Sequence, residues 1–266
     1  MRSEPHPKVK DSHGNGFTCS STVNRLKNGP ANIPEIMEWN TENGYEYLDR
    51  SFAGQSMLYQ AGFVGDAWSV NSWKEDLADD WLFFGRWTEV LPDVEVYGPG
   101  GSTLMEDVRQ GGAGTCYIMS AISTVAEYPS ILQETMLTEE KNAAGVYGFQ
   151  FYIRGKPWVL TIDDTMLFSN PSNPNLYFSF LNNGGTVIWP ALLEKAFAKI
   201  KGSYDQANGG FIETGIRSLT GAPVFTYYAD DIVDDAGANE LWDIFAAGEA
   251  QGYLLGAGTA GAGDDS

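Results

Sequence analysis

A glycine-rich loop that runs directly into a helix constrains this chain more than any other feature. Residues 110–119 read Gln-Gly-Gly-Ala-Gly-Thr-Cys-Tyr-Ile-Met. Three glycines in four residues favour a loop, because glycine weakens both helices and strands. Apolar residues then recur at helical spacing as far as Pro129, which ends the run: Ile118, Ala121, Ile122 and Val125. The pattern predicts a largely buried helix with Cys116 in its first turn.

Cys116 is therefore a candidate nucleophile. The positive end of a helix dipole favours a thiolate. The side-chain amide of Gln110, six residues upstream, can return across the loop as a donor to an oxyanion. A thiolate nucleophile also needs a base, and the two histidines, His6 and His13, both lie in a polar N-terminal segment. The alternative is a structural thiol, since free cysteine is among the most buried residue types, with Gln110 as a loop residue that binds backbone.

Composition narrows the class of protein. The chain has 266 residues, 43% of them hydrophobic, which is enough to bury the core of one large domain or two small ones. A net charge of -19 argues against nucleic acid and against anionic membrane surfaces as partners. Two cysteines, Cys19 and Cys116, are too few for a disulfide framework and indicate a reducing, cytoplasmic compartment. No apolar run approaches the about 18 residues of a membrane span.

Three segments differ in composition. Residues 1–35 are rich in Pro, Gly, Asn and Ser and lack periodicity, so we expect a disordered or extended arm. Residues 36–85 form an aromatic-rich N-terminal extension, which we expect to pack against a partner domain instead of forming its own core. Residues 86–266 carry the clearer elements.

Those elements are a hairpin, two helices and a strand. Phe149–Ile162 alternates as a β-hairpin with its turn at 155–156. Trp189–Ile200 predicts a helix that Gly202 stops, and its charged residues are interpreted as a solvated face: Glu194, Lys195, Lys199 and Lys201. Residues 239–247 are amphipathic, and 252–258 is typical of a short buried strand.

Residues 110–116 resemble the calpain nucleophile loop, Gln-Gly-x-x-Gly-Asp-Cys. Three further segments resemble calpain segments in matching order. They are the helix motif at 189–199, the Gly-Ser-Tyr-Asp-Gln-Ala-Asn-Gly-Gly run at 202–210, and Gly-Tyr-Leu-Leu-Gly at 252–256. The resemblance implies the first lobe of a calpain protease core over 86–266. Such a lobe is α+β and papain-like, rich in helix around the nucleophile helix, with short strands and a hairpin.

The same resemblance implies a calcium-regulated cysteine endopeptidase that cuts intracellular proteins. Cys116 matches the nucleophile, and Gln110 matches the oxyanion donor. Gly209 and Gly210 match the cleft segment that pairs with substrate backbone. The histidine and asparagine of the family lie in a second lobe, which we expect from elsewhere in the same polypeptide or from another one.

The resemblance also implies a calcium site, and Asp107 matches its acidic ligand. The family's glutamate two residues before the helix tryptophan is Val187 here. Calcium takes several oxygen ligands, so we expect a degraded site. The chain departs from the family motif beside the nucleophile too, with Thr115 in place of Asp and Tyr117 in place of Trp.

Two functions therefore stay open. The first is a cysteine endopeptidase completed by the second lobe, which retention of Cys116 and Gln110 favours. The second is a catalytically inactive calpain-like subunit that serves a larger assembly, which Thr115, Tyr117 and the lack of a histidine after Cys116 favour. Peptide cleavage needs an acid for the leaving amine, so we expect this chain by itself to be inactive.

Overall fold

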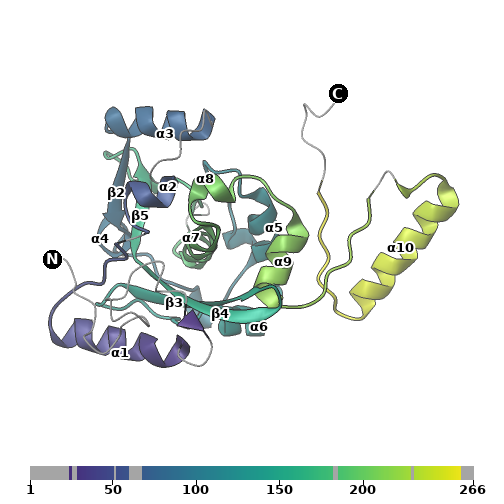
Figure 1. The fold of residues 1–266 in the computed structure, drawn as a ribbon, viewed down its shortest axis with the longest axis horizontal. Helices are drawn as coiled ribbons and strands as arrows, with labels where there is room; N and C mark the ends of the chain where they lie inside the picture. Colours follow the sequence, from purple (N-terminus) through teal and green to yellow (C-terminus); the bar gives the residue numbers. More distant parts are fainter. Residues whose placement is uncertain are drawn as a thin grey trace.

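Helix α7 (Trp189–Lys201) forms the centre of the fold. The computed structural model describes residues 24–25, 29–50, 52–59, 68–181, 185–228 and 231–258. Every residue from Trp189 to Lys199 is buried, so α7 is covered on all sides. Figure 1 shows α7 nearly end-on, with a β-hairpin below it, a second sheet on one side and helices on the other. The predicted helix and its stop at Gly202 are confirmed.

A three-stranded antiparallel sheet covers one side of α7. Strands β3 (Val146–Ile153) and β4 (Lys156–Asp163) form the predicted hairpin, and β1 (Asn24–Arg25) pairs with β4. The turn is Arg154-Gly155, one residue earlier than predicted, and both residues have positive φ. Two such residues are what a tight hairpin turn requires.

A second antiparallel sheet joins distant parts of the chain. Strand β5 (Thr165–Ser169) lies between β2 (Leu82–Arg86) and β6 (Asn175–Leu176). Phe83 stands opposite Phe168, and their rings stack with centroids 5.4 Å apart. Strand β2 therefore ties the end of the aromatic-rich segment into the fold.

Helix α5 (Cys116–Val125) packs against α9 (Ile212–Thr220). The two helices approach so closely that a Cβ on Gly215 would lie 2.6 Å from the Cβ of Ala121. The helix predicted after the glycine loop is thus confirmed. The remaining elements are α1 (Gly29–Glu42), α2 (Gln55–Leu58), α3 (Trp68–Ala78), α4 (Trp87–Val90), α6 (Pro129–Thr135), α8 (Tyr204–Ala207), α10 (Asp235–Ala250) and the 3-10 turns Pro99–Gly101 and Met105–Asp107.

The charged face predicted for α7 is wrong. Glu194, Lys195 and Lys199 are buried. The Nζ atom of Lys195 lies 2.6 Å from Oδ1 of Asp163, and that of Lys199 lies 2.5 Å from Oδ2 of Asp49. A buried charge is tolerated when a hydrogen-bonded partner accompanies it. Apolar periodicity does not reveal such partners, because they come from other segments.

The N-terminal segments differ from the sequence prediction. Helix α1 begins at Gly29, so residues 29–35 are helical where an extended arm was expected, and residues 1–23 lie outside the described part. Ile33 and Ile36 of this helix pack with Val146 and Val159 of the hairpin, which explains its formation. The aromatic-rich segment packs against later elements in a second cluster: Phe52, Met57, Leu58, Trp73, Leu82, Phe178, Ala198 and Tyr204.

Helix α10 (Asp235–Ala250) stands apart from the rest, whereas the segment after it returns to the fold, where the Tyr128 hydroxyl donates to the Gly252 carbonyl at 3.1 Å. Helix α10 extends well beyond the predicted 239–247, and Figure 1 shows it set away from the other elements. The buried strand predicted at 252–258 is wrong. These residues form no ladder with another described strand, and Tyr253 is 61% exposed. Among the described helices, none has the length and apolar content to cross a bilayer.

Candidate active site

Cys116 is the first residue of α5 and is exposed. The apolar side chains that follow hold the helix in place: Ile118, Ala121, Ile122 and Val125 are fully buried. The sequence predicted the place of Cys116 in the first turn of a largely buried helix, and the structure adds that the residue itself is exposed. This exposure leaves the sulfur accessible at the positive end of the helix dipole.

The Gln110 side chain folds back across the glycine loop. Its Nε2 atom donates to the carbonyl of Ala113 at 2.7 Å, and its backbone pairs with Ser179. A side-chain amide nitrogen carries two hydrogens. The bond to Ala113 therefore leaves one hydrogen of this amide for a further acceptor.

Two other segments clamp the glycine loop. On one side, the Gly112 amide donates to the Tyr177 carbonyl at 2.8 Å, and a Cβ on Gly111 would lie 2.0 Å from the Phe178 carbonyl oxygen. On the other side, the Gly114 amide donates to Oδ1 of Asn208 at 2.7 Å. Backbone this close leaves no space for a side chain at 111, which explains the glycine there.

The predicted cleft residues lie against the same loop. The Gly209 amide donates to the Gly114 carbonyl at 2.8 Å, and Gly209 has a φ of 71°. A Cβ on Gly210 would lie 2.7 Å from the Tyr117 ring, whose hydroxyl donates to the Ala207 carbonyl. Gly209 and Gly210 are both exposed. The structure thus brings Gln110, Cys116 and these glycines together around one loop.

Sequence reasoning missed a buried carboxyl group behind the nucleophile. The Thr115 hydroxyl donates to Oε1 of Glu194 at 2.5 Å, and both side chains are buried. Burial raises the pKa of Glu194 to about 7, against the opposing effect of the hydroxyls of Thr115 and Tyr204. The signal that the sequence offers for this residue is its place in the calpain-like motif at 189–199.

The environment of Asp107 does not fit calcium. Its Oδ2 atom accepts from the indole nitrogen of Trp189 at 3.0 Å and from the Leu104 amide at 3.0 Å. Val187, at the position of the family's glutamate, is apolar and buried. Within the described residues, no group of three or more His, Cys, Asp or Glu side chains is placed to hold a metal ion. The carboxylate instead anchors the start of α7.

Comparison with known proteins decides the family. A sequence model described as calpain family cysteine protease matches residues 59–265. The chain belongs to the calpain family of cysteine proteases. Its α+β architecture is that of a papain-like calpain protease core. The match begins at residue 59, before residue 86, where the core was predicted to start.

Plant and animal calpains are among the relatives. The calpain-type cysteine protease ADL1 of Oryza sativa subsp. japonica is 29% identical over 200 residues, 71% of this chain and 9% of that protein. The calpain-type cysteine protease DEK1 of Zea mays is 31% identical over 198 residues, 70% of this chain and 9% of that protein. Calpain-8 of Rattus norvegicus is 34% identical over 143 residues, 53% of this chain and 20% of that protein. The chain therefore spans a small part of these relatives.

Proposed function

We propose that Cys116 is the nucleophile, and Gln110 the oxyanion donor, of an intracellular cysteine endopeptidase. The observation that carries the proposal is the exposed thiol at the first residue of α5, with the Gln110 amide folded back across the adjoining loop. The Cys116 amide lies in the first turn of the helix, where no carbonyl four residues earlier can accept its hydrogen. It can act as a second oxyanion donor.

The reaction that these groups support is acyl transfer. The Cys116 thiolate attacks the carbonyl carbon of an extended peptide, and the Gln110 and Cys116 N–H groups bind the resulting oxyanion. A histidine from a second lobe, oriented by an asparagine, takes the thiol proton and returns it to the leaving amine. Water then hydrolyses the acyl-enzyme. Gly209 and Gly210 offer exposed backbone without side chains for pairing with the substrate.

Exposed apolar side chains support the presence of the second lobe. Phe225 is 80% exposed and Trp242 of α10 is 72% exposed, and several neighbours in the C-terminal part are also exposed: Tyr227, Tyr228, Val233 and Tyr253. Exposed apolar groups gathered in one part of a chain are typical of interaction surfaces. The histidine-bearing lobe, from the same or another polypeptide, would cover this part. No calcium is proposed at Asp107.

Cleavage of an unfolded protein tests the proposal. The protein as isolated from its source is incubated with reduced, unfolded casein, and the fragments are measured by mass spectrometry. We expect cleavage that Cys116→Ala abolishes and that Gln110→Ala slows about 100-fold, the size typical of one lost oxyanion donor. Cleavage that Cys116→Ala leaves unchanged would refute the assignment.

The second candidate is a catalytically inactive subunit. Thr115 and Tyr117, which stand in place of the Asp and Trp of the family motif, and the exposed apolar side chains near α10 favour it. Such a protein would not cleave casein in the same assay, yet it would protect Trp242 from solvent when bound in its assembly.

A further inference from the structure

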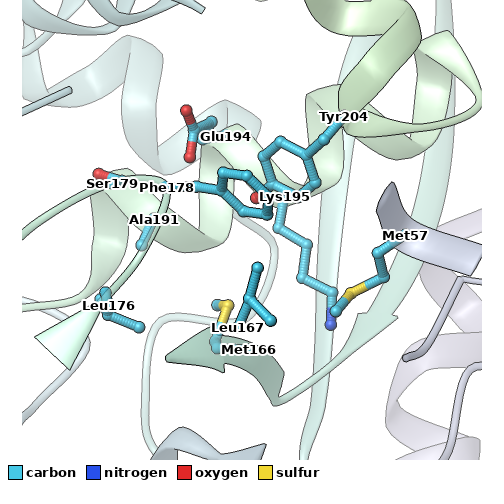
Figure 2. A pocket seen from close by; sticks show the side chains of 10 residues that line it. All are labelled: Met57, Met166, Leu167, Leu176, Phe178, Ser179, Ala191, Glu194, Lys195 and Tyr204. Atoms are coloured by element: carbon cyan, nitrogen blue, oxygen red, sulfur yellow. The ribbon is translucent and has the colours of Figure 1, made fainter. Parts of the chain in front are cut away.

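A small cavity lies behind the nucleophile loop. Its walls are mostly apolar side chains, several of them from α2, β5, β6 and α7. The residues with polar groups are Ser179, Glu194, Lys195 and Tyr204 of α8 (Figure 2). The cavity has room for about one water molecule, because the centre of a sphere of that size can move within about 10 Å³ of it. The loop borders this cavity because Ser179 pairs with Gln110 and Glu194 binds Thr115.

Two buried polar atoms at this cavity make no hydrogen bond of ordinary geometry to the described residues: Oε2 of Glu194 and Oγ of Ser179. Their residues are 1% and 2% exposed. The Tyr204 hydroxyl also faces the Glu194 carboxylate and lowers its pKa, against the larger effect of burial. The Lys195 amine points to the other side of the cavity in Figure 2, where it donates to Asp163 and Thr165. Buried polar groups are nearly always paired, by protein or by ordered water.

The other oxygen of Glu194 connects to the catalytic loop. Oε1 accepts a hydrogen bond from the Thr115 hydroxyl. The Oγ1 atom of this hydroxyl lies 3.4 Å from the Ala113 carbonyl oxygen. The same carbonyl accepts the Gln110 amide at 2.7 Å. Contacts thus run from Glu194 through Thr115 and Ala113 to Gln110. Because Thr115 directly precedes Cys116, these contacts fix the first turn of α5 as well.

We infer that Glu194 is a positioning residue for the nucleophile loop. Its Oε1 atom holds the start of α5 by accepting a hydrogen bond from Thr115. Its Oε2 atom binds one water molecule, and this water also binds the Ser179 hydroxyl. The water thereby holds Ser179, whose backbone pairs with Gln110. The two halves of the candidate site, the thiol and the oxyanion donor, are thereby braced from behind by one carboxyl group. The inference rests on the proposed function only in naming Cys116 the nucleophile and Gln110 the oxyanion donor.

Local hydrogen exchange and thiol alkylation test this role. In the full chain with Cys19→Ser, amide exchange of residues 110–119 and the iodoacetamide rate of Cys116 are measured by mass spectrometry. We expect Thr115→Val to speed exchange about tenfold and to slow alkylation about fivefold, and Thr115→Ser, which keeps the hydroxyl, to restore both. Ser179→Ala should speed exchange of the same residues by about threefold. Thr124→Val, at a half-buried position near the other end of α5, is the matched control and should change neither.

The two proposals fail separately. Exchange and alkylation report on the loop whether or not the protein cleaves peptides, so absence of cleavage leaves this inference standing. Unchanged exchange at 110–119 in both Thr115→Val and Ser179→Ala, with global unfolding unaltered, overturns it. A crystal structure provides the check on the water. One water within hydrogen-bond distance of both Glu194 and Ser179 supports the inference, and direct contact or no water contradicts that part.

Discussion

The Nζ atom of Lys199 lies 2.5 Å from Oδ2 of Asp49, and both side chains are fully buried. The two residues are 150 positions apart. Lys199 also donates to the Thr161 carbonyl, and the Asp49 amide donates to Oδ2 of Asp163 at 2.7 Å. Helix α7, the hairpin and the segment after α1 therefore meet at one buried ion pair. The N-terminal segment thus forms part of the packing around α7.

Replacing Lys199 should destabilise the protein strongly. Lys199→Met leaves the Asp49 carboxylate buried without its cation, and we expect the free energy of unfolding to fall by about 3–5 kcal/mol. Lys201→Met, two residues later on the same helix and half-buried, is the matched control and should cost under about 1 kcal/mol. Urea unfolding followed by circular dichroism measures both. Equal effects would show that the buried pair contributes little.

A methyl group at residue 111 should disrupt the nucleophile loop. Gly111→Ala forces a Cβ toward the Phe178 carbonyl oxygen, a backbone atom that cannot move without breaking the pairing of the loop. We expect a loss of about 1–3 kcal/mol in unfolding free energy, together with slower alkylation of Cys116. Gly258→Ala, at a position with no neighbour within 4 Å, should be neutral. Normal stability of Gly111→Ala would mean that the loop is not clamped as described.

Glu194 should make the protein less stable as the pH rises. Burial raises the pKa of Glu194 from its ordinary value of 4.5 to about 7. Between these two values the unfolded chain has released the proton while the folded protein retains it, so each rise in pH favours unfolding. The loss amounts to about 3 kcal/mol across this window.

The variant Glu194→Gln isolates that contribution. Burial also raises the pKa of Asp164, but Asp164 is present in both proteins, so its effect cancels in the comparison. We expect the wild type to lose about 3 kcal/mol relative to Glu194→Gln between pH 4.5 and 7.5, measured by chemical unfolding at each pH. Parallel stability curves would show that Glu194 releases its proton at the same pH in both states.

Trp242 should contribute to the stability of an interface with the second lobe, but not to the stability of the chain of 266 residues. Its side chain is 72% exposed on α10, so Trp242→Ala in the chain of 266 residues should change stability by less than about 0.5 kcal/mol. The buried Trp73 is the contrast, and Trp73→Ala should cost about 3–5 kcal/mol. In the protein as isolated from its source, Trp242→Ala should lower the melting temperature if the second lobe covers α10. An unchanged melting temperature there would argue against that packing.

Local patterns were sufficient for the elements that carry the site. The glycine run and the apolar spacing after it correctly predicted α5, and the stop at Gly202 correctly predicted the end of α7. Alternation predicted the hairpin, with a one-residue error in its turn. These signals lie within a few residues of one another, so one sequence is enough to read them.

Long-range contacts decided the features that the sequence did not reveal. Strand β2 pairs with β5 across more than 75 residues, and α1 forms at a Pro- and Gly-containing stretch because Ile33 and Ile36 pack on the hairpin. Glu194 falls outside the apolar stripe of α7, so its burial depends on Thr115 in another segment. The strand predicted at 252–258 is wrong for the same kind of reason: the short apolar run is present, but no described strand pairs with it.

The pH dependence of Cys116 alkylation tests the central claim most directly. The protein as isolated from its source is treated with iodoacetamide across pH 4–9, and Cys116 is followed by peptide mass spectrometry with Cys19 as internal reference. The account predicts that Cys116 reacts rapidly down to about pH 5–6, because a cationic partner from the second lobe stabilises its thiolate. A Cys116 that titrates near 8.5 like an ordinary thiol, or does not react, would contradict it.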